Sequence, residues 1–317
     1  MTRVAAIDCG TNSIRLLVAD VDDRAGPLVD VDRRMEIVRL GQGVDRTGRI
    51  SADAMERTLA TARFYGALCA QNGVERIRFV ATSATRDASN QDDFTDGVAA
   101  LLGVEPEIVT GEQEARLSFV GATRGLDASH EPPYLVVDIG GGSTELVVGS
   151  ADVEAACSVD VGCVRLTERH AFADPPTTSQ VVAARADVDA ALDRAVDLVP
   201  LGSVRTLVGL AGSVTTVTAL ALGLDAYDAA RIHGAALPAE TVRSACDALL
   251  RMPAAHRAAL PFMHPGRVDV IGAGALVWRR VVDRAVEETR SAGAPLEVAV
   301  TSEHDILDGI AWSLAAD

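Results

Sequence analysis

The sequence contains no lysine, because all 29 of its cationic residues are arginine. This absence excludes every mechanism with an obligatory lysine, such as phosphate transfer at a P-loop, protein-kinase chemistry and Schiff-base formation. Cations are also the minority, since 45 acidic residues against 29 arginines give a formal net charge of −16 over 317 residues. Broad nucleic-acid binding needs many cations against phosphates. We therefore expect no nucleic-acid partner, whereas an anionic ligand in a locally basic cleft stays compatible with the composition.

Cysteines and long apolar runs are scarce as well. The five cysteines include no Cys-x-x-Cys pair and are odd in number, which favours thiols as small core residues in a reduced cytoplasm. The apolar run at residues 4–7 is too short for a signal peptide. Residues 206–224 carry no charge, but their glycines and threonines favour a buried strand, a glycine turn and a helix. We expect a cytoplasmic protein with no membrane partner.

Short apolar segments alternate with amphipathic ones along the chain, which indicates an α/β protein. The clearest predicted strands cover residues 14–20, 77–81, 135–138 and 296–300. The clearest predicted helices begin after Ser51, cover residues 113–122, carry an apolar stripe from Val188 to Val199, and close the chain with the face of Ile306, Ile310 and Leu314.

An internal repeat is the strongest sign of domain organisation. Residues 7–18, IDCGTNSIRLLV, resemble residues 137–148, VDIGGGSTELVV, with Asp, Gly, Ser, Leu and Val in common at an offset of 130. Each copy contains an apolar strand, an aspartate, a glycine-containing turn, a hydroxyl and a second apolar strand. The repeat predicts a duplicated domain with two similar loops that face a shared cleft.

Both loops contain the residue types that suit a phosphate ligand. Glycines let the backbone approach a ligand, and successive N–H groups then form an anion-binding nest. Serine and threonine hydroxyls add donors, and an aspartate at the strand end suits Mg²⁺, which bridges carboxylates and phosphates while retaining waters. A single turn of this kind has an ordinary β-hairpin as its alternative. Two copies favour phosphate binding.

Further candidates lie outside the repeat. Arg86 follows a predicted strand, where α/β sheets bind ligands, and suits a phosphate; its alternative is a solvated pair with Asp87. Glu112 and Glu114 open a predicted helix. We interpret Glu112 as a complement to the helix dipole, while Glu114 either does the same or accepts a proton from an attacking water. The glycine turn at 209–213 favours close strand–helix packing over nucleotide contact.

Seven ordered blocks carry a resemblance to a known family. They are IDCGTNSIRLLVAD at 7–20, RLGQGVDRTGRIS at 39–51, ATSATRDASNQDDF at 81–94, GEQEARLSFVGA at 111–122, VVDIGGGSTELV at 136–147, DVGCVRLTE at 160–168 and GLAGSVTTVTAL at 209–220. With these blocks the chain resembles the exopolyphosphatase and guanosine pentaphosphate phosphohydrolase family (Ppx/GppA).

The resemblance implies an α/β fold of duplicated ribonuclease-H-like domains, as in the actin-like ATPases, around a central cleft. Domain I would cover residues 1–124 with residues 304–317 returning to it, and domain II would cover residues 125–303. The implied activity is hydrolysis of the terminal phosphoanhydride of inorganic polyphosphate to release orthophosphate, by a homodimer that uses Mg²⁺ or another divalent cation.

The resemblance also implies roles for individual residues. The family's catalytic glutamate precedes Ala-Arg in GEQEAR, which makes Glu114 the general base. Asp138 and Glu145 match the metal-associated catalytic carboxylates, with Asp8 as the counterpart of Asp138 in the first loop. The matching phosphate-binding positions are Thr11, Asn12, Ser13, Arg86, Gly140, Gly141, Gly142, Ser143 and Thr144.

Two alternatives to the exopolyphosphatase remain open from the sequence. A guanosine pentaphosphate phosphohydrolase would remove the same terminal phosphate with the same loops. A non-catalytic sensor of polyphosphate or of guanosine pentaphosphate would use the same loops for binding alone. The presence of Glu114, Asp138 and Glu145 argues against the sensor, because a protein that only binds needs no general base.

Overall fold

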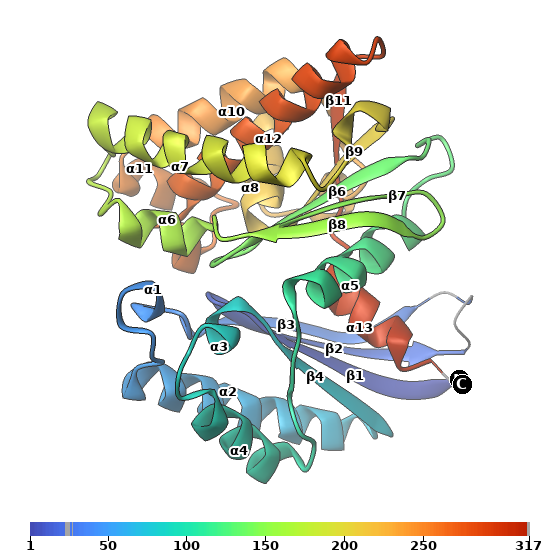
Figure 1. Ribbon diagram of the computed structural model, residues 1–317. Coiled ribbons are helices and arrows are strands. Elements are labelled where there is room, and N and C mark those ends of the chain that lie inside the picture. The colour runs from blue at the N-terminus through green and yellow to red at the C-terminus, as the bar shows by residue number, and fades with distance from the viewer. Residues whose placement is uncertain (23–25, 27, 316–317) are drawn as a thin grey trace. The chain divides into compact units, whose positions relative to one another are not determined.

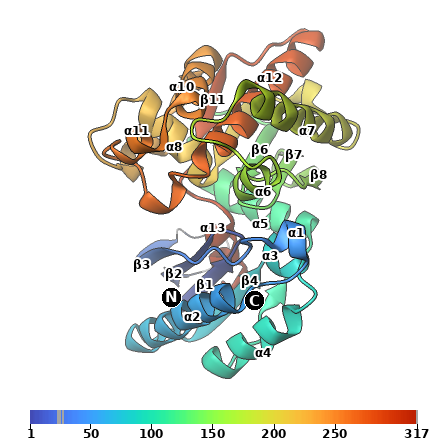
Figure 2. The ribbon, with the colours of Figure 1, turned by 90° about the vertical axis from the view of Figure 1, so that its left-hand side faces the viewer.

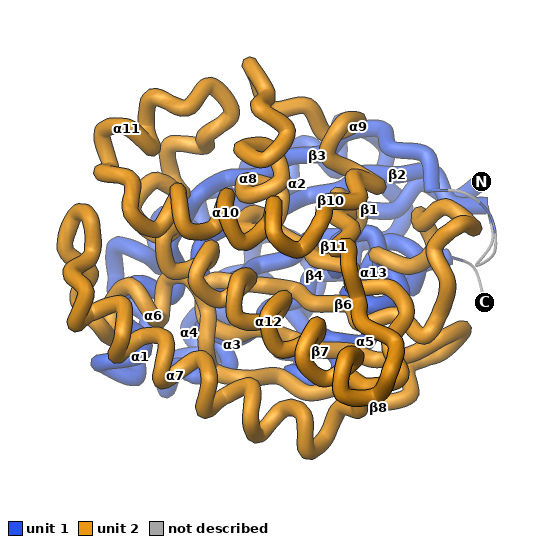
Figure 3. The backbone as a smooth tube through the Cα atoms, turned by 90° about the horizontal axis from the view of Figure 1, so that it is seen from above, with its two compact units in different colours: residues 1–121, 305–317 blue, residues 122–304 orange. Residues whose placement is uncertain are grey.

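The computed structural model describes residues 1–22, 26 and 28–315. The chain divides into two compact units, which Figure 3 distinguishes by colour. Unit 1 comprises residues 1–121 and 305–317, and unit 2 comprises residues 122–304. The chain therefore leaves unit 1 once and returns to it with its last helix.

Unit 1 is built on a five-stranded sheet with the strand order β3-β2-β1-β4-β5 (Figure 1). β1, β2 and β3 are antiparallel neighbours, whereas β4 and β5 continue the sheet parallel to β1. The strands are β1 (Thr2–Cys9), β2 (Ser13–Val21), β3 (Val29–Ile37), β4 (Arg76–Ala81) and β5 (Glu107–Ile108).

Unit 2 repeats this arrangement in a six-stranded sheet with the order β8-β7-β6-β9-β11-β10. Its first five strands have the same order and directions as those of unit 1, and β10 is added at the edge. The strands are β6 (Tyr134–Ile139), β7 (Thr144–Gly149), β8 (Val153–Val159), β9 (Thr206–Leu210), β10 (Ala236–Pro238) and β11 (Val298–Thr301). The two sheets confirm the α/β fold of duplicated, ribonuclease-H-like units.

The duplication extends to single hydrogen bonds. The turn between β1 and β2 closes with a bond of 2.9 Å from the Gly10 N–H to the Ser13 carbonyl. The turn between β6 and β7 closes with a bond of 3.0 Å from the Gly140 N–H to the Ser143 carbonyl. The residues are 130 positions apart in each case, so the repeat seen in the sequence is also a repeat in the hairpin structure.

Helices cover both faces of the first sheet (Figure 2). Alternate residues of β1 show the division, because Ile7 packs in a core with residues of α2 and α4, whereas Ala6 packs in a second core with α13. The helices with residues in unit 1 are α1 (Val44–Thr47), α2 (Ala52–Gln71), α3 (Ser83–Arg86), α4 (Gln91–Leu102), α5 (Gly111–Arg124) and α13 (Ile306–Ser313).

The main core of unit 2 lies between its sheet and long helices, with Trp278 as its largest side chain. The helices are α6 (Cys163–Arg169), α7 (Thr178–Val196), α8 (Ala211–Ala221), α9 (Ala229–Ile232), α10 (Ala239–Arg251), α11 (Ala254–Ala258) and α12 (Ile271–Ser291), with 3₁₀ turns at Leu201–Ser203 and Pro265–Arg267.

Most of the predicted elements are confirmed, with differences at their ends. The charge-free stretch 206–224 is a strand followed by a helix, β9 and α8. Val199 is buried as predicted but lies beyond the end of α7, and the strand predicted at 296–300 runs from Val298 to Thr301. Among the described residues, no helix is long and apolar enough to cross a membrane.

The last helix, α13, is attached to unit 1 by buried charges. Its N-cap Asp305 forms an ion pair with Arg15 of β2, and Asp308 in its first turn forms one of 2.6 Å with Arg33 of β3. Asp305 and Asp308 also form a capping box with each other's backbone N–H groups. The two acidic residues thus cap the start of α13, and arginines of the sheet neutralise their charges.

Two glycines let α13 approach α5 at backbone distance. A Cβ on Gly121 would lie 1.7 Å from the Asp305 carbonyl oxygen, and a Cβ on Gly309 would lie 2.0 Å from the Leu117 carbonyl oxygen. Neither neighbour is a flexible side chain, so neither can move aside without moving a helix. Glycine is therefore required at both positions by the packing of α5 on α13.

We predict that Gly309→Ala lowers the free energy of unfolding by about 1–3 kcal/mol or more, because a methyl group would force the two helices apart. Gly66→Ala is the matched control, since its Cβ would meet only the end of the Leu102 side chain, at 2.7 Å. The gain in helix propensity from glycine to alanine offsets that contact. Urea denaturation curves of both variants test this, and equal midpoints would contradict it.

Candidate functional site

The predicted loop of unit 1 lies where β1 and β4 end. The Thr82 N–H, just past β4, donates to the Cys9 carbonyl at 3.2 Å, so the turn that follows β1 and the start of α3 are neighbours. The Thr11 carbonyl accepts a bond of 2.9 Å from the Gly41 N–H, and a Cβ on Gly41 would lie 2.3 Å from the Thr11 methyl carbon. Thr11 is consequently buried, whereas Asn12 and Ser13 are partly exposed.

Arg86 and Glu114 meet at the same edge of unit 1. Nη1 of Arg86, in the last turn of α3, donates to the Val109 carbonyl at 2.8 Å and to Oε2 of Glu114 at 3.3 Å. Glu114 is placed by the start of α5, where Thr110 and Gln113 exchange side-chain and backbone hydrogen bonds in a capping box. The structure therefore pairs Arg86 with Glu114, a partner that the sequence did not predict.

The two glutamates of α5 have different surroundings. The Glu112 side chain is 64% exposed and pairs with Arg116 one turn later, at 2.9 Å. The Glu114 side chain is only 11% exposed and contacts Arg86. The surface position of Glu112 agrees with its interpretation as a helix-end charge. Burial of a carboxylate needs a specific partner, which separates Glu114 from an ordinary first-turn acid.

The glycine loop of unit 2 is held by the start of α6. The Gly140 carbonyl accepts a bond of 3.0 Å from the Cys163 N–H, and the Gly141 carbonyl accepts bonds of 2.9 and 3.0 Å from the next two N–H groups. A Cβ on Gly162 would lie 2.4 Å from the Gly141 carbonyl group. Arg165 completes the contact, because its Nε donates to the Gly142 carbonyl at 2.7 Å. The loop carbonyls are thus turned toward α6.

Asp138 and Glu145 lie directly opposite each other on β6 and β7. Opposite residues of an antiparallel pair share one face of the sheet, so the two carboxylates are neighbours, and both are buried. Ser158, opposite Glu145 on β8, donates its hydroxyl to Oε1 of Glu145 at 2.8 Å. This hydrogen bond orients the Glu145 carboxylate.

The equivalent pair in unit 1 has opposite charges. Asp8 lies opposite Arg15 on β1 and β2, and its Oδ2 accepts bonds of 3.0 and 2.7 Å from Nε and Nη2 of Arg15. Arg15 also forms an ion pair with Asp305. Burial raises the pKa of the Asp8 carboxyl above its ordinary value, against the opposing effect of Arg15. The same hairpin position therefore has an internal ion pair in unit 1 and two acids in unit 2.

Three residues of the predicted phosphate loop are buried, namely Gly142, Ser143 and Thr144. The Thr144 side chain is completely buried, and its hydroxyl donates to the Val161 carbonyl. It anchors the loop, so we leave it out of the proposed phosphate ligands. Ser143 is 2% exposed, whereas Gly140 and Gly141 are partly exposed.

The glycine turn after β9 is explained by packing. A Cβ on Gly209 would lie 2.7 Å from both Trp278 and Val214, and a Cβ on Gly212 would lie 2.2 Å from the guanidinium carbon of Arg267. These distances agree with the close strand–helix contact predicted from the sequence.

Thiol chemistry is not favoured at either loop. All five cysteines are free and buried. Cys9 ends β1 beside the first loop, and Cys163 begins α6 beside the second. Burial raises the pKa of the Cys9 thiol well above its ordinary value and that of Cys163 to about 11. Both thiols are therefore protonated at neutral pH and are poor nucleophiles.

The carboxylates suit a cation that takes few protein ligands. Among the described residues, no group of three or more His, Cys, Asp or Glu side chains is arranged to hold a metal ion. Mg²⁺ is commonly held by one or two carboxylates together with waters and substrate phosphates. The neighbouring Asp138 and Glu145 provide such a donor pair.

Comparison with known proteins identifies the family. A model of the Ppx/GppA phosphatase family matches residues 17–289. The chain belongs to the Ppx/GppA phosphatase family. It is 51% identical to Exopolyphosphatase 2 of Mycobacterium tuberculosis, over 99% of both chains. A solved exopolyphosphatase-like protein superimposes with a TM-score of 0.93 at 45% identity, covering 98% of this chain and 97% of the other. The Ppx/GppA family member of Aquifex aeolicus superimposes with a TM-score of 0.80 at 31% identity, with the same coverage of each chain.

Several residues that support the candidate site of this Ppx/GppA protein were not predicted from the sequence. Ser158 had no motif to mark it, because only the pairing of β7 with β8 brings it to Glu145. Asp305 lies 290 positions from Arg15. Gly41 and Gly162 stand within the blocks that carry the family resemblance, but their role depends on close contacts with loops that are distant in sequence.

We predict that Arg15→Gln lowers the free energy of unfolding by about 3–5 kcal/mol at pH 7, because it leaves the buried carboxylates of Asp8 and Asp305 without their cation. Without Arg15, burial and the neighbouring charge of Asp305 raise the pKa of Asp8 further. A carboxyl whose pKa is raised in the folded state favours the protonated folded protein, so the deficit is largest at neutral pH and shrinks as the pH falls through that pKa.

Arg3→Gln is the matched control, since Arg3 pairs with Asp20 across the same two strands at a partly exposed position. Ion pairs in contact with solvent contribute little to stability, so we expect a much smaller change. Urea denaturation of both variants between pH 4 and pH 8 measures the difference. A deficit of Arg15→Gln that is absent, or that grows toward low pH, would contradict the assignment.

Proposed function

We propose that this Ppx/GppA protein is an exopolyphosphatase, which hydrolyses the terminal phosphoanhydride of inorganic polyphosphate and releases orthophosphate. The observation that carries the proposal is the 51% identity, over 99% of both chains, to a protein named Exopolyphosphatase 2. The duplicated glycine turns and the pair of half-buried Arg86 with buried Glu114 support the proposal, because they have groups that suit this reaction.

The glycine loop of unit 2 supplies backbone donors for phosphate. The Gly140 N–H closes the turn, and the loop carbonyls bond to α6. We therefore assign the phosphate contacts to the N–H groups of Gly141, Gly142 and Ser143. Such fixed donors stabilise the charge on the transferred phosphoryl group without reorganising during the reaction. Asn12 and Ser13 provide the equivalent polar groups of the unit 1 loop.

Glu114 is the proposed general base. A buried carboxylate at the start of α5 accepts the proton of the attacking water as the oxygen bonds to phosphorus and the bridging oxygen leaves with the shortened chain. Arg86 holds Glu114 through Nη1, which leaves Nε and Nη2 as the donors that we assign to the phosphoryl oxygens. One guanidinium would then orient both the base and the substrate.

Asp138 and Glu145 are the proposed holders of a divalent cation, with Mg²⁺ as the expected ion. The cation would offset negative charge on the terminal phosphoryl group. Ser158 supports this arrangement by orienting Glu145. We leave Asp8 out of the proposed ligands, because Oδ2 of Asp8 already accepts two hydrogen bonds from Arg15. The homodimer implied by the resemblance remains a prediction.

The alternatives raised by the sequence are not favoured. Guanosine pentaphosphate hydrolysis would use the same residues, but a relative that covers 99% of this chain at 51% identity is named an exopolyphosphatase. A pure sensor would have no need of a buried glutamate beside an arginine.

We predict that Glu114→Gln lowers the rate of orthophosphate release from polyphosphate by about 10²–10⁴-fold, because the amide cannot accept the proton of the attacking water. Glu112→Gln removes the same charge from the same helix turn and is expected to keep the native rate, since Glu112 is exposed. The measurement uses short polyphosphate, long polyphosphate and guanosine pentaphosphate at matched concentrations with Mg²⁺.

Three outcomes of this assay would contradict the proposal. Near-native turnover by folded Glu114→Gln would remove Glu114 from the reaction. Release from guanosine pentaphosphate alone would replace the proposed substrate. Retained binding of polyphosphate without release from any substrate would make the protein a sensor.

We predict that EDTA abolishes phosphate release and that added Mg²⁺ restores it. Asp138→Asn is expected to raise the Mg²⁺ concentration needed for half-maximal rate at least about tenfold, because one of two proposed ligands loses its charge. Asp152→Asn is the control, since Asp152 is an exposed acid in the turn at the far end of β7. Activity that is insensitive to EDTA, or equal Mg²⁺ dependence of the two variants, would overturn this assignment.

A further inference from the structure

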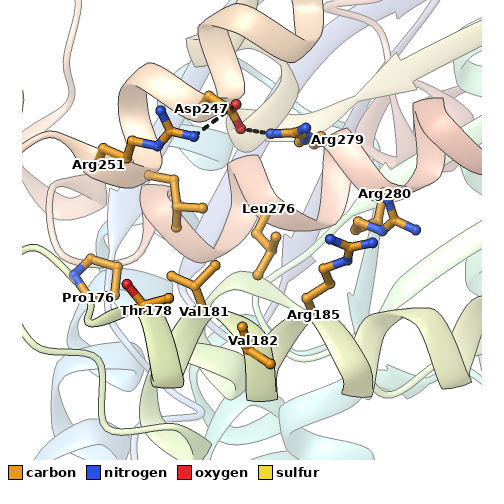
Figure 4. Close-up of a pocket in the computed structure, with 11 residues that line it drawn as sticks. Pro176, Thr178, Val181, Val182, Arg185, Asp247, Arg251, Leu276, Arg279 and Arg280 are labelled. Atoms are coloured by element: carbon orange, nitrogen blue, oxygen red, sulfur yellow. Dashed lines mark hydrogen bonds and ion pairs between the residues drawn. The ribbon is translucent and has the colours of Figure 1, made fainter.

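A pocket of about 470 Å³ lies between α7, α10 and α12, entirely within unit 2 (Figure 4). None of its lining residues belongs to the phosphate loops or to the carboxylates of the candidate site. Its volume falls in the range of about 300–1,000 Å³ that is typical of sites for small organic ligands. The pocket is therefore separate from the candidate site and large enough for a small organic ligand of its own.

The floor of the pocket is aliphatic. Leu250 of α10 and Leu276 of α12 are buried side chains that line it, and Val181 of α7 packs against them. Val182, on the next position of α7, also lines the pocket and is 61% exposed. Covering such aliphatic surface with an apolar group lowers the free energy, because the surface is removed from water. Aliphatic side chains have no polar atom that could bind a small inorganic ion, so the floor favours a ligand with an apolar part.

The rim of the pocket is cationic in a chain with a net charge of −16. Four arginines and one aspartate line it, and the arginines come from all three helices (Figure 4). In the close-up the labelled guanidinium groups lie above the aliphatic side chains and to their right. A cationic rim above an apolar floor is complementary to a ligand with one anionic end and one apolar end.

The arginines are arranged as two pairs that each share one aspartate. Asp247 forms its close ion pair with Arg279 and a longer contact of 3.4 Å with Arg251. Asp189 forms its close ion pair of 2.5 Å with Arg280 and a longer contact of 3.4 Å with Arg185. In both pairs the guanidinium with the longer contact is the more exposed one, at 79% for Arg251 and 59% for Arg185.

This sharing determines which arginines can take a ligand. Three carboxylates, those of Asp189, Asp247 and Asp283, face the four guanidinium groups, so one positive charge is left unbalanced among them. Asp283 contacts Arg279 and Arg280, the two arginines that are already closely paired, at 3.9 and 2.8 Å. Arg251 and Arg185 are therefore the groups whose N–H donors suit an incoming carboxylate.

We propose that this pocket binds an amphipathic organic anion, namely a carboxylate with a medium-length aliphatic tail. The tail would lie on Val181, Leu250 and Leu276, and the carboxylate would pair with Arg185 or Arg251. Each methylene buried on the floor strengthens binding by up to about fourfold. The proposal does not depend on the activity assigned above, because it uses none of the residues of the candidate site.

Isothermal titration calorimetry of the full chain with octanoate tests the proposal. We expect saturable binding of octanoate and at least tenfold weaker binding of acetate, which has the charge without the tail, and of octanol, which has the tail without the charge. Octanoate that fails to bind, or binds no more tightly than acetate or octanol, would overturn the proposal.

Variants locate the binding. The double variant Arg185→Gln with Arg251→Gln is expected to weaken octanoate at least tenfold, and both close ion pairs of Asp189 and Asp247 remain in it to support the fold. The control removes two exposed arginines of α7 and α12 outside the pocket, as Arg194→Gln with Arg290→Gln. Equal affinities of the two double variants would place octanoate elsewhere and overturn the proposal.

A third variant tests the apolar contact. Val182→Asp places a carboxylate at the exposed edge of the floor, where the change is compatible with folding. It is expected to weaken octanoate at least tenfold by repulsion and by loss of apolar contact. Thermal denaturation confirms that each variant is folded, and phosphate release is expected to stay at the native rate in all of them. Unchanged octanoate affinity in folded Val182→Asp would contradict the assigned position of the tail.

Discussion

The candidate site depends on one short turn that occurs twice. In each unit a glycine N–H bonds to a serine carbonyl three residues later and closes the first hairpin of the sheet, at Gly10 and at Gly140. Closing the turn at this length sets the register of the hairpin. It therefore places Asp8 opposite Arg15 and Asp138 opposite Glu145. The positions of these four charged side chains follow from that register.

The same hairpin serves different purposes in the two units. In unit 1 the pair of Asp8 and Arg15 extends to Asp305, so its charges help to hold the last helix on the first sheet. In unit 2 the pair of Asp138 and Glu145 collects negative charge at the loop. A duplicated backbone thus provides one hairpin whose charges stabilise the fold and one whose charges suit a cation. The difference arises from a single position, arginine in one copy and glutamate in the other.

The sequence was informative wherever the signal is local or repeated. Ser51 caps α2 as predicted, and the strand, turn and helix expected at 206–224 are β9 and α8. Predictions were weaker where the burial or partner of a residue depends on chain segments that are distant in sequence. Glu112 and Glu114 are two positions apart in one helix turn, and their spacing alone does not show which of them is buried. Only the packing of α5 beside Arg86 leaves one exposed and buries the other.

By itself the sequence determined the fold class, the duplication and the family, because these follow from hydrophobic periodicity and from motifs that are contiguous in the chain. Only the tertiary structure decided that Arg86 pairs with Glu114, that Thr144 is turned inward, and that glycine is obligatory where α5 meets α13. The arginine-rimmed pocket was also decided by the tertiary structure alone, since its three helices are separated by other segments of the chain. Such features result from packing between elements that are remote in sequence, and periodicity carries no information about which elements will meet.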